Sequence, residues 1–183
     1  RTSGALGYTM QVEQGDKYLL TKKELENKIA TFTGGRAAEE IVFGEITTGA
    51  SNDIERATSV ARNMVTRYGF SEKLGPILYG HENQEVFLGR DYSQGRNYSE
   101  NVAAEIDGEI RELIETGYEK AKEILTEHGD LLERCAQYLM KHEKIDGPDF
   151  YKLMADEIDI DGNPKKKPED IAETAPSEET KTE

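Results

Sequence analysis

Near the beginning of the chain, apolar residues recur at helical spacing directly after a helix-start signal. Thr21 and Glu24 match a capping box, in which each residue satisfies a backbone donor of the other. Apolar residues follow at three- and four-residue steps, which predicts a helix over about residues 22–43. We expect Gly34 and Gly35 to interrupt or loosen this helix, because glycine lowers helix stability.

A second stripe at helical spacing follows a connection of small residues. Ser51 or Asn52 is a natural N-cap for this helix, and Gly69 is a natural C-cap. Its inner face carries Ile54, Ala57, Ala61, Met64, Val65 and Tyr68. Small residues also lie on the inner side of the first helix, so we expect the two backbones to approach closely.

Three more helices are predicted in the second half of the chain. Ser99 can cap a long helix over about residues 99–127, and the next helix covers about 129–143. Asp146-Gly147-Pro148 predicts the start of a short last helix, because proline is tolerated in a first turn.

The chain also carries a small extended part. Residues 5–12 alternate loosely between apolar and polar positions before a turn, which predicts a strand. Short apolar runs between residues 70 and 96 are punctuated by Gly, Pro and Asn, and they predict short strands or an ordered surface loop. The expected fold is therefore mainly α with a small β part, including an edge strand near the N-terminus.

Composition separates a folded part from a tail. A length of 183 residues suits about one core. From Ile158 onward the chain has almost no apolar content, so we expect one domain over residues 1–157 and a disordered acidic tail over 158–183. The chain starts at Arg1, inside an expected strand and without Met, and we interpret it as an excised segment.

Charge and hydropathy exclude some classes of partner. The chain has 37 acidic and 23 basic residues and a net charge of -14, which argues against a surface that binds duplex nucleic acid. No apolar stretch approaches the roughly 20 residues that cross a bilayer, so we expect this segment to be soluble.

Few residues offer catalytic chemistry. No Gly-rich loop ends in Gly-Lys-Ser/Thr, so no ATP site is predicted here. The histidines His81, His128 and His142 are too far apart for the i, i+4 pair that holds zinc on one helix. His142 and Asp146 mimic a His-Glu-x-x-His motif, but we expect the helix to end between them. Cys135 lies in an apolar stripe, which favours a core residue over a reactive thiol.

One carboxylate stands out against this background. Asp53 lies in the first turn of the second stripe, four residues before Ala57 and eight before Ala61, so its side chain leans toward the buried face. A carboxylate at a helix N-terminus is stabilised by the macrodipole by about 0.3 to 1 kcal/mol. An inward-facing carboxylate also needs a cation, and a metal ion is one possibility.

Several long segments resemble the peptidase domain of the FtsH family of ATP-dependent zinc metallopeptidases. The similarity continues to about residue 156 and covers the predicted helices. The segments that carry it are Gly4–Thr9, Gly34–Gly44, Thr48–Thr58, Tyr68–Pro76 and Phe87–Arg90.

The resemblance implies a metal site that is divided between this segment and the chain before it. Members of the family run from a membrane anchor through an ATPase module to the peptidase domain. A His-Glu-x-x-His helix, expected shortly upstream of Arg1, supplies two zinc ligands and the general base, so no catalytic residue is expected in this chain. Asp53 falls on the family's third zinc ligand. ATP is implied in the upstream module only, and the segment by itself is expected to be inactive.

The resemblance also implies partners and a location. Glu39 or Glu40 is expected to orient a ligand histidine, and Gly7, Tyr8 and Thr9 are expected to pair with an unfolded protein substrate as an added strand. The full-length protein is expected to be a homo-hexamer, anchored at the cytoplasmic face of the bacterial inner membrane, that degrades membrane and unfolded cytoplasmic proteins. The alternative is a helical oligomerisation module without catalytic function.

Overall fold

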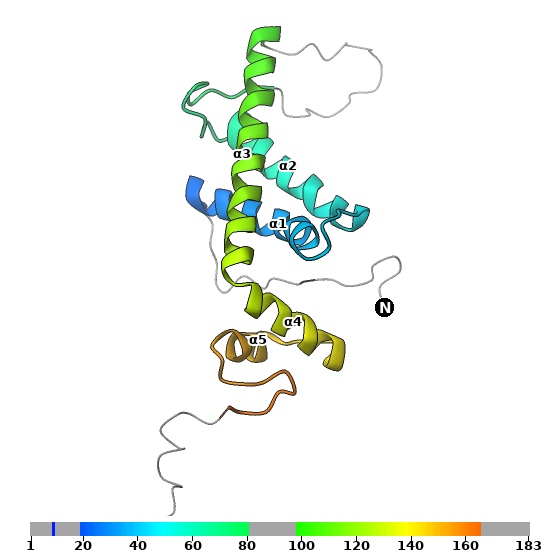
Figure 1. Ribbon diagram of the computed structural model, residues 1–183. Helices are drawn as coiled ribbons and strands as arrows, with labels where there is room; N and C mark the ends of the chain where they lie inside the picture. Colours follow the sequence, from blue (N-terminus) through cyan, green and yellow to red (C-terminus); the bar gives the residue numbers. More distant parts are fainter. Residues whose placement is uncertain (1–8, 10–18, 81–97, 166–183) are drawn as a thin grey trace, which may run out of the picture. The chain divides into compact units, whose positions relative to one another are not determined.

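Helices account for nearly all of the regular structure. The computed structural model describes residues 9, 19–80 and 98–165, and these residues form two compact units, Arg1–Lys122 and Glu123–Glu183 (Figure 1). The elements are α1 (Lys22–Phe43), a 3-10 turn η1 (Thr48–Ala50), α2 (Ser51–Thr66), α3 (Glu100–Glu127), α4 (Gly129–His142) and α5 (Gly147–Met154). The prediction of a mainly helical fold is confirmed.

The predicted β part has little counterpart among the described residues. Within them, the strand-type pairing is a single antiparallel bridge between Ile158 and Pro164. Apart from Thr9, the expected edge strand over residues 5–12 lies outside the described residues, as does the apolar run at 85–90.

The start of α1 forms as its sequence predicts. Thr21 Oγ1 accepts a hydrogen bond from the Glu24 N–H at 3.3 Å, and Glu24 Oε2 accepts one from the Thr21 N–H at 2.8 Å. Of the two alternatives expected at Gly34 and Gly35, interruption of the helix is wrong, because α1 is continuous from Lys22 to Phe43. The residues flanking the pair are held by packing, with Thr33 and Ala37 both buried, and this packing offsets the low helix propensity of glycine.

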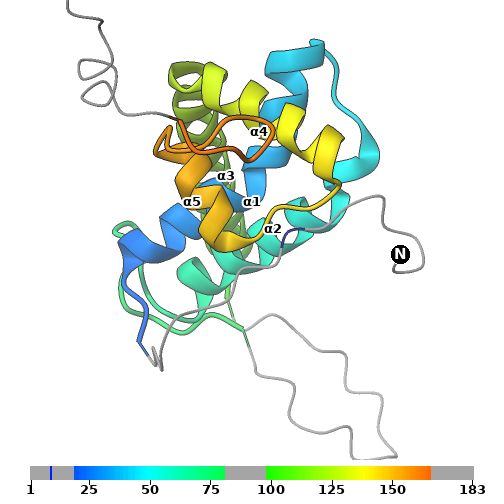
Figure 2. The same cartoon turned by 90° about the horizontal axis from the view of Figure 1, so that it is seen from below.

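Three helices share the core of the first unit. Ala57 and Ala61 of α2 are fully buried, in agreement with the predicted stripe, and α2 packs on α1. Figure 1 shows α3 crossing α1 and α2, and Figure 2 looks nearly along the axis of α3. Ile106 and Ile110 of α3 belong to the same buried cluster. The other buried members are Leu25, Ile29, Ala57, Ala61, Met64, Val65 and Leu74.

A second, smaller core lies in the unit that contains α4 and α5. Its buried members are Tyr138, Leu153 and Ile158, with Cys135 and Ile145 packed against them. The sequence places the start of a disordered tail at Ile158, but that side chain is only 6% exposed. The folded chain therefore extends beyond the expected boundary, because one apolar residue returns to α4 after α5 has ended.

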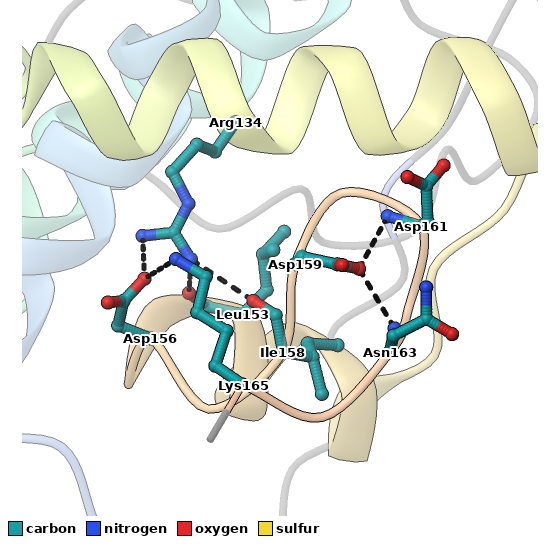
Figure 3. A network of polar contacts seen from close by, with 8 residues as sticks. All are labelled: Arg134, Leu153, Asp156, Ile158, Asp159, Asp161, Asn163 and Lys165. Atoms are coloured by element: carbon teal, nitrogen blue, oxygen red, sulfur yellow. Dashed lines mark hydrogen bonds and ion pairs between the residues drawn. The ribbon is translucent and has the colours of Figure 1, made fainter. Parts of the chain in front are cut away.

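Polar contacts hold this returning segment (Figure 3). Arg134 of α4 donates to the backbone oxygens of Leu153 and Ile158 at 2.9 and 3.3 Å, and its guanidinium lies 2.7 Å from the Asp156 carboxylate. Asp159 Oδ1 accepts from the N–H groups of Asp161 and Asn163, both at 2.9 Å, and so closes the turn after Ile158.

Two truncations should therefore differ in stability. Removing residues 158–183 deletes the buried Ile158 and one acceptor of Arg134. We expect the melting temperature of this unit to fall by about 8 to 16 °C, since burial of one Ile contributes roughly 2 kcal/mol. Removing only residues 166–183, which contain Ile171 as their single large apolar side chain, should change it by about 1 °C or less. Thermal unfolding followed by circular dichroism measures both, and equal melting temperatures would contradict the expectation.

Candidate functional site

Asp53 occupies the first turn of α2, as the sequence predicts. Its side chain is half-buried and lies on the helix face that continues through the fully buried Ala57 and Ala61. Among the described residues, no side chain or backbone group forms a hydrogen bond or ion pair with the Asp53 carboxylate.

The chain enters α2 differently from the prediction. Ser51 and Asn52 already belong to the helix, and both are exposed. Ala50 takes the N-cap position without a side-chain hydrogen bond. The capping group lies earlier, where Thr47 Oγ1 accepts from the Gly49 N–H at 3.1 Å and starts the 3-10 turn. This difference arises because the 3-10 turn leads directly into α2, so that the side-chain cap lies at Thr47, four residues before Ser51.

Glu39 joins this turn to α1. Glu39 Oε2 accepts from the Thr47 N–H at 2.9 Å, and Glu39 Oε1 accepts from the Thr47 hydroxyl at 2.7 Å. The Thr47 backbone N–H, and after it the Thr47 hydroxyl, hold the pKa of the Glu39 carboxyl below its usual range. A Cβ at Gly49 would lie 3.2 Å from Thr47 Oγ1 and 3.3 Å from Glu39 Oε1, so the turn has little room for a larger residue.

Glu40 lies next to Glu39 but has different partners. The Tyr118 hydroxyl donates to Glu40 Oε2, and Lys122 Nζ lies 3.2 Å from Glu40 Oε1. The Tyr118 hydrogen bond, followed by that of Lys122, holds the pKa of the Glu40 carboxyl below its usual range. Glu40 therefore links α1 to α3, whereas Glu39 links α1 to the entry of α2.

The histidines do not assemble a metal site among the described residues. α4 ends at His142, Glu143 takes φ 59°, and Asp146 is the N-cap of α5, so the resemblance to His-Glu-x-x-His is not realised on one helix. His142 Nε2 lies 3.2 Å from the Ile160 backbone oxygen. His81 lies outside the described residues, and the part of the chain that the structure describes contains no group of three His, Cys, Asp or Glu side chains that could hold a metal ion.

The other residues that the sequence singles out are a cysteine of α4 and three residues near the N-terminus. Cys135 packs against the second core, and burial raises the pKa of its thiol, as expected for a core residue. Gly7 and Tyr8 lie outside the described residues, and Thr9 is exposed. No helix in residues 19–80 or 98–165 is both long and apolar enough to span a bilayer.

A comparison with protein families identifies the family of this chain. A family model described as Peptidase family M41 matches residues 1–153. The chain belongs to peptidase family M41. Asp53, Glu39 and Thr47 all fall within the part that matches the M41 model.

Relatives in the same family are similar over most of this chain. It is 47% identical to an ATP-dependent zinc metalloprotease FtsH of Thermotoga maritima over 155 residues, which are 85% of this chain and 25% of that protein. It is 48% identical to FtsH 2 of Petrotoga mobilis over 174 residues, 95% of this chain and 28% of the relative. It is 51% identical to FtsH 1 of a Thermoanaerobacter species over 156 residues, again 85% and 25%. The M41 segment thus spans about a quarter of the length of the curated relatives it matches.

Sequence reasoning missed Thr47. A threonine two residues before a glycine in a run of small residues is typical of a turn in which the hydroxyl accepts a backbone N–H. That local signal can identify the turn, but the contact with Glu39 joins residues eight positions apart and depends on how α1 ends.

Proposed function

We propose that this chain is the distal part of the proteolytic domain of an ATP-dependent zinc metalloendopeptidase, and that Asp53 is its contribution to the zinc site. The observation that carries the proposal is the half-buried carboxylate of Asp53, which has no protein partner among the described residues and lies at a helix start in an M41 segment. The relatives' names specify zinc, ATP dependence and proteolysis for those proteins.

Asp53 is chemically suited to serve as one zinc ligand. An unpaired carboxylate is a suitable oxygen donor, and the helix macrodipole favours negative charge at the start of α2. The other two ligands and the general base are proposed to lie upstream of Arg1, on a His-Glu-x-x-His helix. Zinc bound by three protein ligands would supply Lewis acidity and would lower the pKa of a bound water to about 7. Asp53 would contribute one oxygen ligand and a negative charge.

The surface of α1 is suited to a closely packed neighbour. A Cβ built at Gly34 or Gly35 meets no atom within 4 Å, so both positions have open space beside them. We propose that the upstream zinc helix packs there, with Glu39 or Glu40 orienting a ligand histidine. Each carboxylate keeps acceptor capacity beyond the bonds described above. Unchanged zinc affinity in a Glu40→Gln variant would contradict that role for Glu40.

The segment by itself is expected to lack both zinc and activity. A single carboxylate binds zinc weakly, because a stable site needs three protein ligands and the proposal assigns two of them, with the base, to the upstream helix. Metal analysis after dialysis should find far less than one equivalent of zinc in the 183-residue chain, whereas the full-length protein should retain about one per subunit. Tight equimolar zinc in the 183-residue chain would mean that the proposed ligand set is incomplete.

The N-terminal residues Gly7, Tyr8 and Thr9 are proposed to bind substrate by strand addition. Backbone pairing accepts any sequence, which suits a protease that receives unfolded chains. Replacing the exposed Thr9 by Pro removes a backbone donor and should impair cleavage of an unfolded protein while ATP hydrolysis persists. Normal cleavage by a well-folded Thr9→Pro variant would mean that the substrate does not bind at these residues.

The full-length protein is proposed to be a homo-hexamer anchored at the cytoplasmic face of the bacterial inner membrane, acting on membrane and unfolded cytoplasmic proteins. This follows from the resemblance to the FtsH family and from the M41 match. Sedimentation of the detergent-solubilised full-length protein tests the assembly, and a monomer at all concentrations would contradict it.

A further inference from the structure

The first turn of α2 has few contacts that hold it in place. Thr47, Thr48, Gly49, Ser51 and Asn52 are all exposed, and Ala50 is the one buried side chain in this run. The fully buried residues of α2 begin with Ala57, one turn after Asp53. The turn that carries Asp53 is therefore packed less completely than the rest of the helix, since Asp53 and Ile54 are only half-buried.

The two hydrogen bonds from Thr47 to Glu39 supply the missing constraint. They are at 2.9 and 2.7 Å, and the acceptor carboxylate belongs to α1, which is anchored in the core through Ala37 and Thr33. Thr47 Oγ1 also accepts the Gly49 N–H, so one hydroxyl connects Glu39 to the backbone that becomes α2. Hydrogen bonds to an ionised carboxylate are stronger than those between neutral groups.

We propose that Glu39 and Thr47 are positioning residues that hold the start of α2 against α1 and thereby fix the Asp53 carboxylate for zinc. This inference rests on the proposed function of Asp53. In this proposal Thr47 supports the position of Asp53, and Glu39 acts on Asp53 through its contact with the turn at residues 47–50. Partners that orient a metal ligand typically change metal affinity or activity by about 10- to 100-fold when removed.

The full-length protein is the test material, and Thr47 is the residue to change first. Thr47→Val removes the hydroxyl at nearly constant size, while Thr47→Ser keeps the hydroxyl and serves as the conservative rescue. Thr66→Val is the matched control, because it removes one hydroxyl hydrogen bond, 2.8 Å to the Arg62 backbone oxygen, from the other end of the same helix. Glu39→Gln removes the acceptor charge on the α1 side.

Zinc affinity measured by chelator competition is the main readout, together with melting temperature and ATP hydrolysis. Thr47→Val and Glu39→Gln should each weaken zinc binding by about 10-fold or more, and Thr47→Ser and Thr66→Val should stay within about 3-fold of the parent. ATP hydrolysis should persist in all four variants. The comparison of Thr47→Val with Thr66→Val separates positioning from general destabilisation. At equal melting temperatures, zinc affinity should fall further in Thr47→Val than in Thr66→Val.

Three outcomes would overturn the inference. If Thr47→Val keeps zinc affinity while Asp53→Asn loses it, Asp53 is a ligand that needs no support from Thr47, and only this inference fails. Weakening in Glu39→Gln alone would mean that Glu39 acts on the zinc site without Thr47. If Asp53→Asn itself retains zinc, the proposed ligand role fails, and the positioning role fails with it.

Discussion

Replacing Asp53 by Asn in the full-length protein should abolish stoichiometric zinc binding and peptide hydrolysis together, while ATP hydrolysis survives. The substitution preserves size and leaves an oxygen at the start of α2, but it removes the negative charge that zinc prefers. The ATPase module is proposed to lie upstream of this segment, so its activity should not depend on Asp53. Zinc content and both activities can be measured on one preparation.

The competing explanation predicts a very different result. If Asp53 only complements the helix macrodipole, its replacement should cost about 0.3 to 1 kcal/mol of stability and leave zinc and proteolysis intact. Glu55→Gln is a matched control, because Glu55 is an exposed carboxylate two residues further along the same helix. Full peptidase activity with zinc retained in Asp53→Asn would end the ligand hypothesis.

Replacing Gly117 by Val should destabilise the first unit by about 1 to 3 kcal/mol. Gly117 is buried in α3, and a Cβ built there would lie 2.7 Å from Ile29 Cγ2 and 3.3 Å from the Ala30 backbone nitrogen. Ile29 is fully buried and its branched side chain is stiff, so neither atom can move without disturbing the contact between α1 and α3. Chemical denaturation monitored by circular dichroism measures the free energy of unfolding.

Gly108 provides the control for this substitution on the same helix. It is exposed, and a Cβ built there meets no atom within 4 Å. Gly108→Val should therefore leave stability within about 0.5 kcal/mol of the parent or raise it slightly, because valine has a higher helix propensity than glycine. Equal destabilisation by the two substitutions would show that α3 does not approach α1 closely at Gly117.

Two of the helix starts in this protein are determined locally. The capping box at Thr21 and Glu24 and the cap at Ser99, whose hydroxyl accepts the Val102 N–H at 3.3 Å, both form where the sequence predicts them. Such caps join residues three positions apart, so the chemistry that makes them is written in a short stretch of sequence. The end of α4 is similar, since it stops at His142 before the turn that leads to Pro148.

The candidate zinc ligand required two kinds of information. Helical periodicity alone predicts that Asp53 leans toward the face of Ala57 and Ala61, and the structure agrees. Periodicity does not decide between the macrodipole and metal interpretations, because both need a carboxylate at a helix start. The proposed role as a ligand depends on the likeness to a family whose other ligands lie elsewhere in the chain.

By itself, the sequence determined which segments are helical, where most of them start, and that Asp53 leans toward a buried face. Tertiary structure decided that Gly117 is a contact point and Gly108 is not, that Glu39 binds Thr47 while Glu40 binds Tyr118, and that Ile158 returns to a core. The physical reason is the range of the interactions. Caps and periodicity act within one or two turns, whereas these contacts depend on which helices meet and at what distance.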